Sequence, residues 1–407
     1  MLDDATLKQL TENVKTPFYV YDAELIRKNI KAVNRAFEGV SVHFSLKSNP
    51  CPAVSAVIAR AGAQAEIASP FEARIAATAG FSPENILYDG PGKTLDNIRE
   101  VLSLGVKRFN IESMTELERL KQVAGEDISR LTVCFRVNPL DPSNAAEKMT
   151  GKPSRFGIDI EKFTESLEVA SAAGVNISGI HLYLGSQILS EQQLIDNYEV
   201  GLKLLRNNID KLKDSSAVEY VFGCGFGIPY SNDESELDLK MIADGFERLR
   251  QEYDFCGNLI TRFELGRYII ANAGKYLAEV SDVKISRGEK FITLSGGVNH
   301  FMRYVMTGAK HRVRRLGKEC LDFEHAEVCG QTCTPYDVLT QCNMPADIAA
   351  GDIIVLDDAG AYGWSMGIQN FLSFPSCAEI LLDNGKFDIV RRKGSFEDII
   401  ELCSIPE

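Results

Sequence analysis

Two residues far apart in the sequence carry the side chains best suited to covalent and proton-transfer chemistry, Lys47 and Cys333. Lys47 ends the apolar run Phe44-Ser45-Leu46 and precedes Ser48-Asn49-Pro50. An amine at the end of a buried strand loses hydration, which lowers its pKa and makes it a nucleophile. The Cys333 thiol is suited to giving a proton to a carbanion. Most lysines are solvated surface charges and most cysteines small buried hydrophobes, so these roles depend on the neighbouring motifs.

A glycine loop, Gly223-Cys224-Gly225-Phe226-Gly227, follows a predicted strand. Such a loop lets backbone N–H groups approach a phosphate, although many tight turns have the same composition. It is not a dinucleotide fingerprint, because Ile228 stands where that pattern requires glycine. The stretch Gly90–Thr94 imitates the end of a P-loop, but Leu87 replaces the required upstream glycine. We therefore expect an anion site at 223–227 and no nucleotide site at 90–94.

Three further motifs offer charge, hydroxyl and aromatic groups. Glu264-Leu265-Gly266-Arg267 closes a predicted strand, either as an ordinary ion pair or as a carboxylate that keeps a ring nitrogen protonated. His181 and Tyr183 share one face of a strand, and Ser186 follows in the turn; a structural histidine is the plainer alternative. Ala359–Met366 is an aromatic turn whose small residues would let Tyr362 approach a ligand.

The elements that position these residues alternate in type. Helical patterns such as Pro70–Ala79, Leu95–Ser103 and Met114–Ala124 separate short apolar runs, and several end at glycine, at 62, 80, 105 and 174. This alternation predicts an α/β fold, a parallel (β/α)8 TIM barrel, with an open doubly wound sheet as the alternative. The eight runs are Val40–Leu46, Ala65–Ala68, Ile86–Tyr88, Arg108–Ile111, Leu131–Val137, Ile177–Leu184, Tyr220–Phe222 and Ile260–Glu264.

The placement of polar residues favours the barrel. They cluster where predicted strands end, and only a closed barrel brings all strand ends to one mouth. They are Lys47, Glu66, Glu112, Arg136, His181 with Tyr183, Gly223–Gly227 and Glu264–Arg267.

After residue 271 the pattern becomes strand-rich without long helices. Tyr276–Ile285, Lys290–Leu294, Ala326–Gly330, Asp352–Leu356, Glu379–Leu382 and Phe387–Arg391 are the expected strands. We expect a barrel domain at 26–270. A β-rich domain, sandwich-like or barrel-like, should combine 1–25 with 271–407, and the predicted strand at 17–21 should belong to it.

Composition excludes several classes of function. The 407 residues carry a formal charge of −13, which argues against nucleic acid as a partner. The N-terminus is acidic where a signal peptide is basic, and no run is apolar enough to span a membrane, so a cytoplasmic protein is expected. The ten cysteines are scattered without the paired spacing of a zinc site, so we expect no metal.

Together these motifs resemble the fold-type III pyridoxal-phosphate decarboxylases, the family of diaminopimelate and ornithine decarboxylases. The resemblance spans about 17–395, and it is the joint order of the motifs that is specific. It rests on Phe44–Asn49, His181–Gln187, Gly223–Gly227, Glu264–Arg267, Gly330–Asp337 and Ala359–Tyr362.

The resemblance implies that pyridoxal 5'-phosphate is the cofactor and that Lys47 holds it as a Schiff base. Glu264 would contact the pyridine nitrogen. The family also implies an obligate homodimer, in which Cys333 of one subunit completes the other subunit's site as the proton donor. Ser186, Gly225, Arg267 and Tyr362 would hold the phosphate, and the remaining expected cofactor contacts are Glu66, Arg136, His181, Tyr183, Gly223 and Gly266.

The sequence departs from the family pattern at three positions. Leu265 replaces a common proline, Tyr183 replaces a histidine that stacks on the ring, and Thr334 replaces an acidic residue that grips a distal ammonium. The sequence is similar to a branch of the family whose members also have Cys-Thr-Pro at this point. Its members act on a carrier-protein-bound glutamyl group or a citryl-linked amino acid in antibiotic and siderophore biosynthesis.

We therefore expect decarboxylation of an amino acid whose distal end is conjugated or anionic. Thr334, Tyr362 and Arg303 are the expected substrate contacts, and Arg303 belongs to a basic run, 303–315, that suits either a solvated loop or an anion site. The alternatives are diaminopimelate decarboxylase and a non-catalytic regulatory homologue. A racemase would need a tyrosine in place of Cys333, and a cofactor-carrier protein would lack residues 271–407.

Overall fold

Eight parallel strands close into a barrel. In the computed structural model, which describes residues 2–140, 147–148, 153–255 and 257–406, each strand pairs with the next and the last pairs with the first. The predicted barrel is confirmed, and the open sheet is wrong because it would leave two unpaired edges. The strands are β2 (Ser41–Ser45), β3 (Gln64–Ile67), β4 (Ile86–Tyr88), β5 (Arg108–Ile111), β6 (Thr132–Asn138), β9 (Gly179–Tyr183), β11 (Val218–Gly223) and β12 (Leu259–Leu265).

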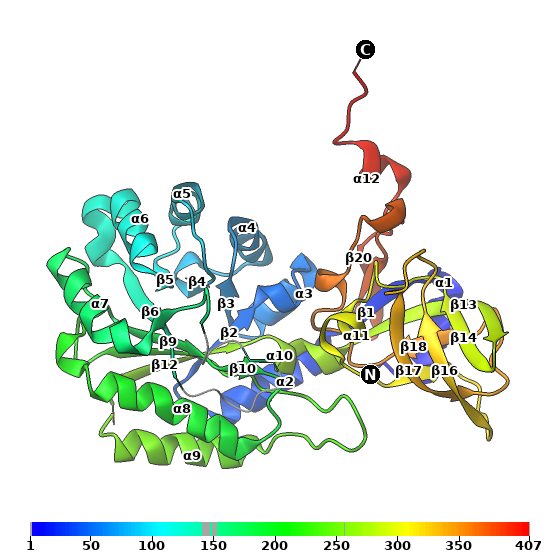
Figure 1. Ribbon diagram of the computed structural model, residues 1–407, viewed down its shortest axis with the longest axis horizontal. Helices are drawn as coiled ribbons and strands as arrows, with labels where there is room; N and C mark the ends of the chain where they lie inside the picture. The colour runs from blue at the N-terminus through cyan, green and yellow to red at the C-terminus, as the bar shows by residue number, and fades with distance from the viewer. Residues whose placement is uncertain (1, 141–146, 149–152, 256, 407) are drawn as a thin grey trace. The chain divides into compact units, whose positions relative to one another are not determined.

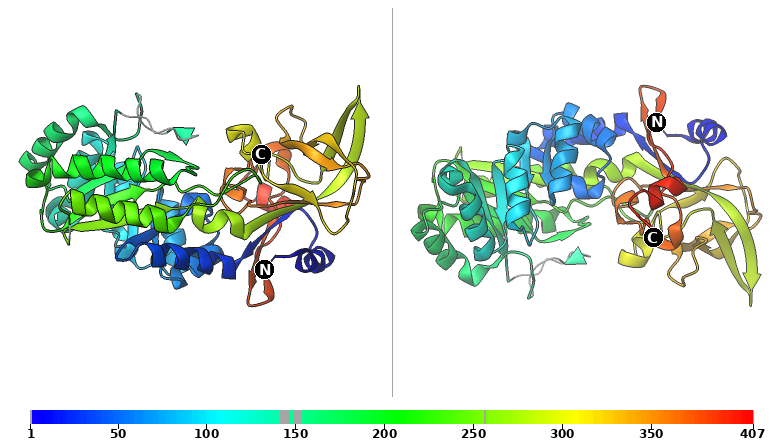
Figure 2. Two further views of the ribbon diagram at one scale, coloured as in Figure 1. Left: turned by 90° about the horizontal axis from the view of Figure 1, so that it is seen from below. Right: turned by 90° about the horizontal axis from the view of Figure 1, so that it is seen from above.

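Helices cover the outside of these strands (Figures 1 and 2). Serine side chains cap the N-termini of two of these helices. The Ser69 side chain accepts from the N–H of Glu72 at 3.1 Å in the helix that begins at Pro70, and the Ser113 side chain caps the helix that begins at Met114. Glycines in the left-handed conformation end several of them, as predicted, with φ of +93° at Gly80. The helices are α2 (Ala23–Ala36), α3 (Pro52–Arg60), α4 (Pro70–Ala79), α5 (Leu95–Ser103), α6 (Met114–Ala124), α7 (Ile160–Ala172), α8 (Glu191–Arg206) and α9 (Leu239–Glu252).

The barrel interior is layered. Leu87, Cys134 and Val221 form a buried apolar cluster inside it. Towards the N-terminal ends of the strands, Arg262 donates to Glu219 at 2.7 and 3.0 Å, so a buried carboxylate and guanidinium neutralise each other there. The polar C-terminal ends are therefore separated from the opposite end by packed side chains.

The chain divides into two compact units. The barrel unit comprises Lys28–Ile228 and Ser235–Tyr268. The β-rich unit comprises Met1–Arg27, Pro229–Glu234 and Ile269–Glu407, so a short segment between barrel strands groups with it. None of the helices that the structure describes combines the length and apolar character needed to cross a membrane.

The β-rich unit is built on a nine-stranded sheet. The N-terminal strand β1 (Phe18–Asp22) pairs with β13 (Gly274–Ser286) and β19 (Ala378–Asp383), which confirms that the chain's start joins this unit. Leu7 of α1 (Asp4–Asn13) packs with Phe18, Leu277 and Ile380 in its core. The other strands are β14 (Glu289–Leu294), β15 (Val313–Arg315), β16 (Phe323–Cys329), β17 (Val338–Pro345), β18 (Ile353–Leu356) and β20 (Lys386–Arg391).

Two of these strands were not predicted. β15 is Val-Arg-Arg, and β17 contains Gln341 and Asn343, so neither shows an apolar run. β17 ends the strand order of the sheet, where one side lacks a neighbour, and pairs with β16. β15 pairs with β18. Backbone pairing rather than composition makes both of them strands.

The contact between β9 and β11 depends on a glycine. A Cβ on Gly179 would lie 1.7 Å from the carbonyl oxygen of Glu219, so Gly179→Ala must push the strands apart. We expect a loss of about 3 kcal/mol in the free energy of unfolding, measured by urea denaturation. Gly62→Ala is the control: its Cβ would meet nothing, and only its left-handed backbone would cost about 1 kcal/mol. Equal losses in the two variants would contradict this account of the barrel.

Candidate active site

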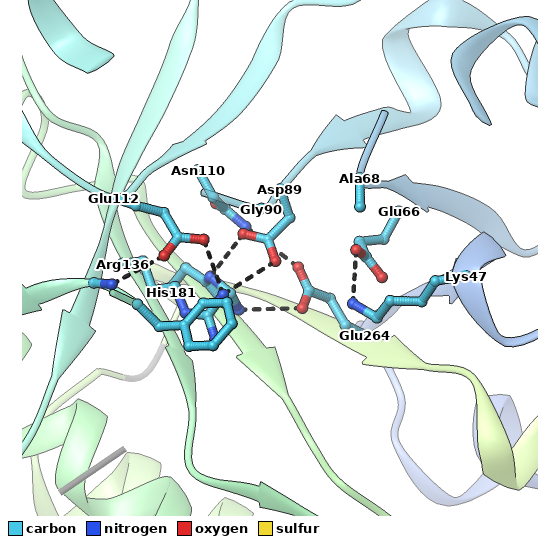
Figure 3. A network of polar contacts seen from close by, with 12 residues as sticks. Lys47, Glu66, Ala68, Asp89, Gly90, Asn110, Glu112, Arg136, His181 and Glu264 are labelled. Carbon is cyan, nitrogen blue, oxygen red and sulfur yellow. Dashed lines mark hydrogen bonds and ion pairs between the residues drawn. The ribbon is translucent and has the colours of Figure 1, made fainter. Parts of the chain in front are cut away.

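Lys47 lies in the turn directly after β2, at the C-terminal end of the barrel. Its Nζ is 3.0 Å from Oε1 of Glu66, which lies in β3 (Figure 3). The Lys47 side chain is 42% exposed, so the expectation that burial activates this amine is wrong. The Glu66 side chain is fully buried instead. Burial raises the pKa of Glu66 to about 7, although Lys47 opposes the rise, so this carboxyl can take up a proton near neutral pH.

Asp89, His181 and Glu264 meet in the centre of the barrel mouth. The His181 ring lies between two carboxylates, with Nδ1 3.2 Å from Asp89 and Nε2 3.1 Å from Glu264. Glu264 also accepts from the side-chain amide of Asn110 at 3.3 Å. Figure 3 shows Glu264 between the Lys47 amine and the histidine.

Arg136 compensates the acidic groups on the other side. Its guanidinium lies 3.0 Å from Glu112 and 3.6 Å from Asp89. Glu112 in turn accepts from the N–H of Gly157 at 2.9 Å. Tyr183 ends β9 nearby, with its ring centre 5.9 Å from the Arg136 guanidinium carbon, and is the aromatic group expected at the mouth.

A second group of residues in the barrel unit includes the glycine loop that is expected to bind an anion. Arg267 donates to the hydroxyl of Ser186 at 3.1 Å, and both are buried. The glycine loop packs against this segment so closely that a Cβ on Gly225 would lie 2.1 Å from the carbonyl oxygen of Gly185. A Cβ on Gly223 would lie 2.6 Å from the Tyr183 ring, and one on Gly266 would lie 2.9 Å from Ser48. Backbone, one hydroxyl and one guanidinium therefore lie close together at the strand ends.

In the β-rich unit, Cys333 is exposed on a turn that Asp337 organises. Asp337 is 3% exposed, and its carboxylate accepts from the N–H of Val298 at 2.8 Å and from the N–H of Thr332 at 2.7 Å, as well as from the Thr332 hydroxyl. The hydroxyl of Thr334 accepts from the N–H of Tyr336 at 3.3 Å. The turn that bears the thiol is thus fixed by its own hydrogen bonds.

Arg303 and Tyr362 also lie in this unit. Arg303 is 2% exposed, with its guanidinium carbon 5.2 Å from the Tyr230 ring centre and 5.9 Å from that of Tyr362. Its Nε donates to His311 at 3.0 Å. Tyr362 adopts a left-handed backbone with φ of +60°, which costs energy outside glycine. Arg303 is therefore a packed cation beneath aromatic rings.

Three arginines of the basic run at 303–315 form ion pairs with acidic side chains. Arg312 pairs with Asp358 at 2.5 Å, Arg314 with Asp357 at 3.0 Å, and Arg315 with Asp347 at 3.0 Å. The alternative of an anion-recognising strip is wrong for these three residues, because acidic side chains far along the chain neutralise them.

The sequence motifs did not predict two residues of the barrel mouth, Asp89 and Asn110. Asp89 directly follows β4, so the strand-end rule that found its neighbours also applies to it. Asn110 lies inside β5 and gives no such signal.

The expected site residues divide between the two units. The barrel set comprises Lys47, Glu66, Arg136, His181, Tyr183, Ser186, Glu264, Arg267 and the glycines at 223, 225 and 266; the set in the β-rich unit is Arg303, Cys333, Thr334 and Tyr362.

The donor set of the barrel fits one kind of cofactor. An accessible amine, a carboxylate for a ring nitrogen, an aromatic face and anion-binding groups are what an aldehyde-bearing pyridine phosphate requires. The glycines let the backbone of the loop pack directly against Gly185, Tyr183 and Ser48, which leaves its N–H groups unobstructed by side chains of their own. The residues present are thus compatible with pyridoxal 5'-phosphate.

Comparison with known proteins agrees with this chemistry. Residues 23–271 match the family described as pyridoxal-dependent decarboxylase, pyridoxal binding domain. The L-glutamyl-[BtrI acyl-carrier protein] decarboxylase of Niallia circulans is 32% identical over 98% of this chain and 96% of that protein. Diaminopimelate decarboxylase of Zymomonas mobilis is 31% identical, covering 98% and 95%. The 2-[(L-alanin-3-ylcarbamoyl)methyl]-2-hydroxybutanedioate decarboxylase of Staphylococcus aureus is 29% identical, covering 91% and 95%.

The turn that bears Cys333 generates a prediction about stability. Asp337→Asn replaces one accepting oxygen with a donor, which leaves a buried N–H facing another donor. We expect the free energy of unfolding to fall by about 2 kcal/mol in urea denaturation. Asp322→Asn, an exposed acid in the same unit, should change it by less than about 0.5 kcal/mol. A loss no larger than that of the control would remove Asp337 from this role.

Proposed function

This chain belongs to the pyridoxal-dependent decarboxylases, and we propose that its substrate is an amino acid whose distal end is conjugated or anionic. It is an amino acid decarboxylase, and pyridoxal 5'-phosphate is its cofactor. The closed barrel and the separate β-rich unit are the fold that carries this activity.

We assign the cofactor contacts from the barrel geometry. Lys47 would bind the aldehyde carbon, and Glu264 would hold the proton on the ring nitrogen. Tyr183 would cover a face of the ring, and Glu66, Arg136 and His181 would surround it. When bound, the protonated pyridine ring accepts the electron pair that remains when CO2 leaves. The phosphate contacts within the barrel would be Ser186, Gly223, Gly225, Gly266 and Arg267. Tyr362 of the β-rich unit is a further phosphate contact that the family resemblance implies.

Proton transfer by this chain's own groups completes the reaction. Glu66 lies at hydrogen-bonding distance from Lys47, and its raised pKa lets it exchange a proton with the amine when the substrate arrives. Cys333 would deliver its proton to Cα after the carboxylate has left and would recover one from water. The overall change is loss of CO2 and gain of one proton, which leaves an amine. The exposed thiol on a fixed turn supports this role.

We propose a homodimer in which Cys333 of one subunit serves the site containing Lys47 of the other. The family resemblance supports this arrangement. In a symmetric dimer both sites are then equivalent.

The observation that carries the substrate proposal is Thr334. It offers a neutral hydroxyl beside the proposed proton donor, whereas a distal ammonium would need a carboxylate there. A charged group left without a partner costs several kcal/mol, or about a hundredfold in selectivity. Because Arg312, Arg314 and Arg315 are already paired, an anionic distal end would depend on other groups, of which Arg303 is the buried candidate.

The relatives support both this proposal and its rival. Two act, by their names, on a glutamyl group of an acyl-carrier protein and on a carbamoyl-linked hydroxybutanedioate. Diaminopimelate decarboxylase is the alternative function, because a member of that activity has almost the same identity. A non-catalytic homologue is disfavoured, since Lys47 and Cys333 are both present.

Two variants test the proposed chemistry and the shared site. Lys47→Ala should abolish both CO2 release and the visible absorbance of the bound cofactor. Cys333→Ala should retain the cofactor but release aldehyde and pyridoxamine phosphate beside the normal amine, because Cα loses its proton donor.

Mixing the two impaired proteins should restore part of the activity after subunit exchange, since one site of a mixed dimer is intact. Wild-type rates in either variant, or no recovery despite proven exchange, would defeat the corresponding assignment.

Substrate preference tests the proposal at Thr334. The wild type should have at least about a hundredfold higher kcat/KM for an acylated or carrier-linked amino acid than for lysine, ornithine or diaminopimelate. Thr334→Glu should shift that ratio towards the diamino acids by about tenfold or more. Gln331→Glu adds the same charge three residues away and should leave the ratio unchanged. Diaminopimelate as the best wild-type substrate would establish the rival function instead.

A further inference from the structure

Three ionisable side chains from three strand ends meet where solvent hardly reaches them. His181 is 0% exposed, Asp89 is 3% exposed and Glu264 is 7% exposed. Each ring nitrogen of His181 faces its own carboxylate, at 3.2 and 3.1 Å. These contacts are ion pairs by distance rather than well-aligned hydrogen bonds. The imidazole thus separates two buried carboxylates that otherwise have to share one low-dielectric space.

The charge of the ring follows from its surroundings. Burial by itself lowers the pKa of His181, but the carboxylates of Asp89 and Glu264 outweigh burial and raise it to about 9. Burial likewise raises the pKa of Asp89, yet His181 and Arg136 outweigh it and hold that pKa well below its usual range. A cation bridging two anions is the state that satisfies all three groups.

Neighbouring strands contribute further charges to the same mouth. Arg136 on β6 lies 3.6 Å from Asp89 and pairs with Glu112 after β5. Lys47 after β2 pairs with Glu66 on β3. Each of these two cations thus pairs with an acid outside the group formed by Asp89, His181 and Glu264. His181 contacts Glu264 at 3.1 Å.

We propose that His181 is a positioning residue whose doubly protonated ring, seated between Asp89 and Glu264, holds the Glu264 carboxylate oriented towards the cofactor's ring nitrogen. The role of Glu264 at that nitrogen rests on the proposed function. The charge of the triad formed by Asp89, His181 and Glu264 does not. A carboxylate has lone pairs enough for His181, Asn110 and one further N–H. Asp89 acts through the histidine, because its negative charge helps to retain the second ring proton.

The same three side chains present oxygen and nitrogen atoms within 4.8 Å of one another, which also suits a divalent cation. A ring protonated on both nitrogens has no lone pair to give a metal. The charged triad therefore requires a His181 ring with both nitrogens protonated, whereas a metal site requires a ring with a free lone pair. A spectrum that reports the protonation of the ring nitrogens distinguishes the two.

The first experiment measures that state in cofactor-free wild-type protein. Histidine labelled with 15N should show two N–H groups on His181 at pH 8, assigned by loss of the signal in His181→Gln. His43 is an internal control, because it is equally buried and its pKa is lowered to about 3 by burial and by Arg262. His43 should show one N–H. A neutral His181 ring at pH 8, or zinc that binds the wild type but not His181→Gln, would overturn the proposal.

The second experiment measures cofactor affinity. His181→Gln and Asp89→Asn should each raise the Kd for pyridoxal 5'-phosphate at least tenfold, while His43→Gln should leave it unchanged. Wild-type affinity in both triad variants would overturn the positioning role even with a charged ring. A wild type that binds no pyridoxal 5'-phosphate would instead reject the proposed function, with the spectrum still reporting the charge of the triad.

A pH series gives a readout independent of the cofactor. The folded-state pKa of His181 lies above its unfolded value of about 6.5, so the triad stabilises the fold fully below that pH. Its contribution should be lost as the pH rises through about 9. The difference in unfolding midpoint between wild type and His181→Gln should shrink over that interval, and a difference that grows with pH would contradict the charged ring.

Discussion

Compensation of buried charge is the constraint on which the site depends. Glu66, Asp89, Glu112 and Glu264 are buried at the C-terminal ends of barrel strands, and an unpaired carboxylate there costs several kcal/mol. Lys47, Arg136 and His181 each meet at least one of them. Because each acid comes from a different strand or the loop after it, the cations also fix how the strand ends converge. Glu264, the carboxylate proposed to contact the cofactor's ring nitrogen, is held by His181 and Asn110.

The β-rich unit holds the thiol proposed as proton donor in an exposed position. Asp337 is buried and ties the turn together, while Cys333 on the same turn is exposed. The close approach that this requires is possible because Gly297 lacks a side chain: a Cβ there would lie 2.2 Å from the Asp337 carboxylate. The same unit buries Arg303 beneath two tyrosine rings and neutralises the neighbouring arginines. Under the proposed function, this charge pattern would restrict which substrates are recognised.

Much of this arrangement could be predicted from the sequence, and the failures have physical reasons. The eight barrel strands were predictable because buried parallel strands are continuous apolar runs between amphipathic helices. Polar residues after such runs marked the mouth, and Asp89 was missed although it fits the same rule. Pairings between distant residues gave no signal: Asp358 and Asp357 neutralise Arg312 and Arg314 only once the chain has folded. Edge strand β17 was hidden by its polar composition, and the exposure of Lys47 could not be read from its apolar neighbours.

The central claim is that Lys47 carries the cofactor of this decarboxylase, and covalent trapping tests it most directly. The protein loaded with pyridoxal 5'-phosphate would be reduced with borohydride, digested and mapped by mass spectrometry. We expect the added cofactor mass on the peptide that contains Lys47. Lys93 is the informative contrast, because it is a buried lysine whose amine donates to the carbonyl oxygens of Gly90 and Asn110 and pairs with Glu116. Cofactor mass on Lys93, or on no lysine of a protein that retains activity, would contradict the claim.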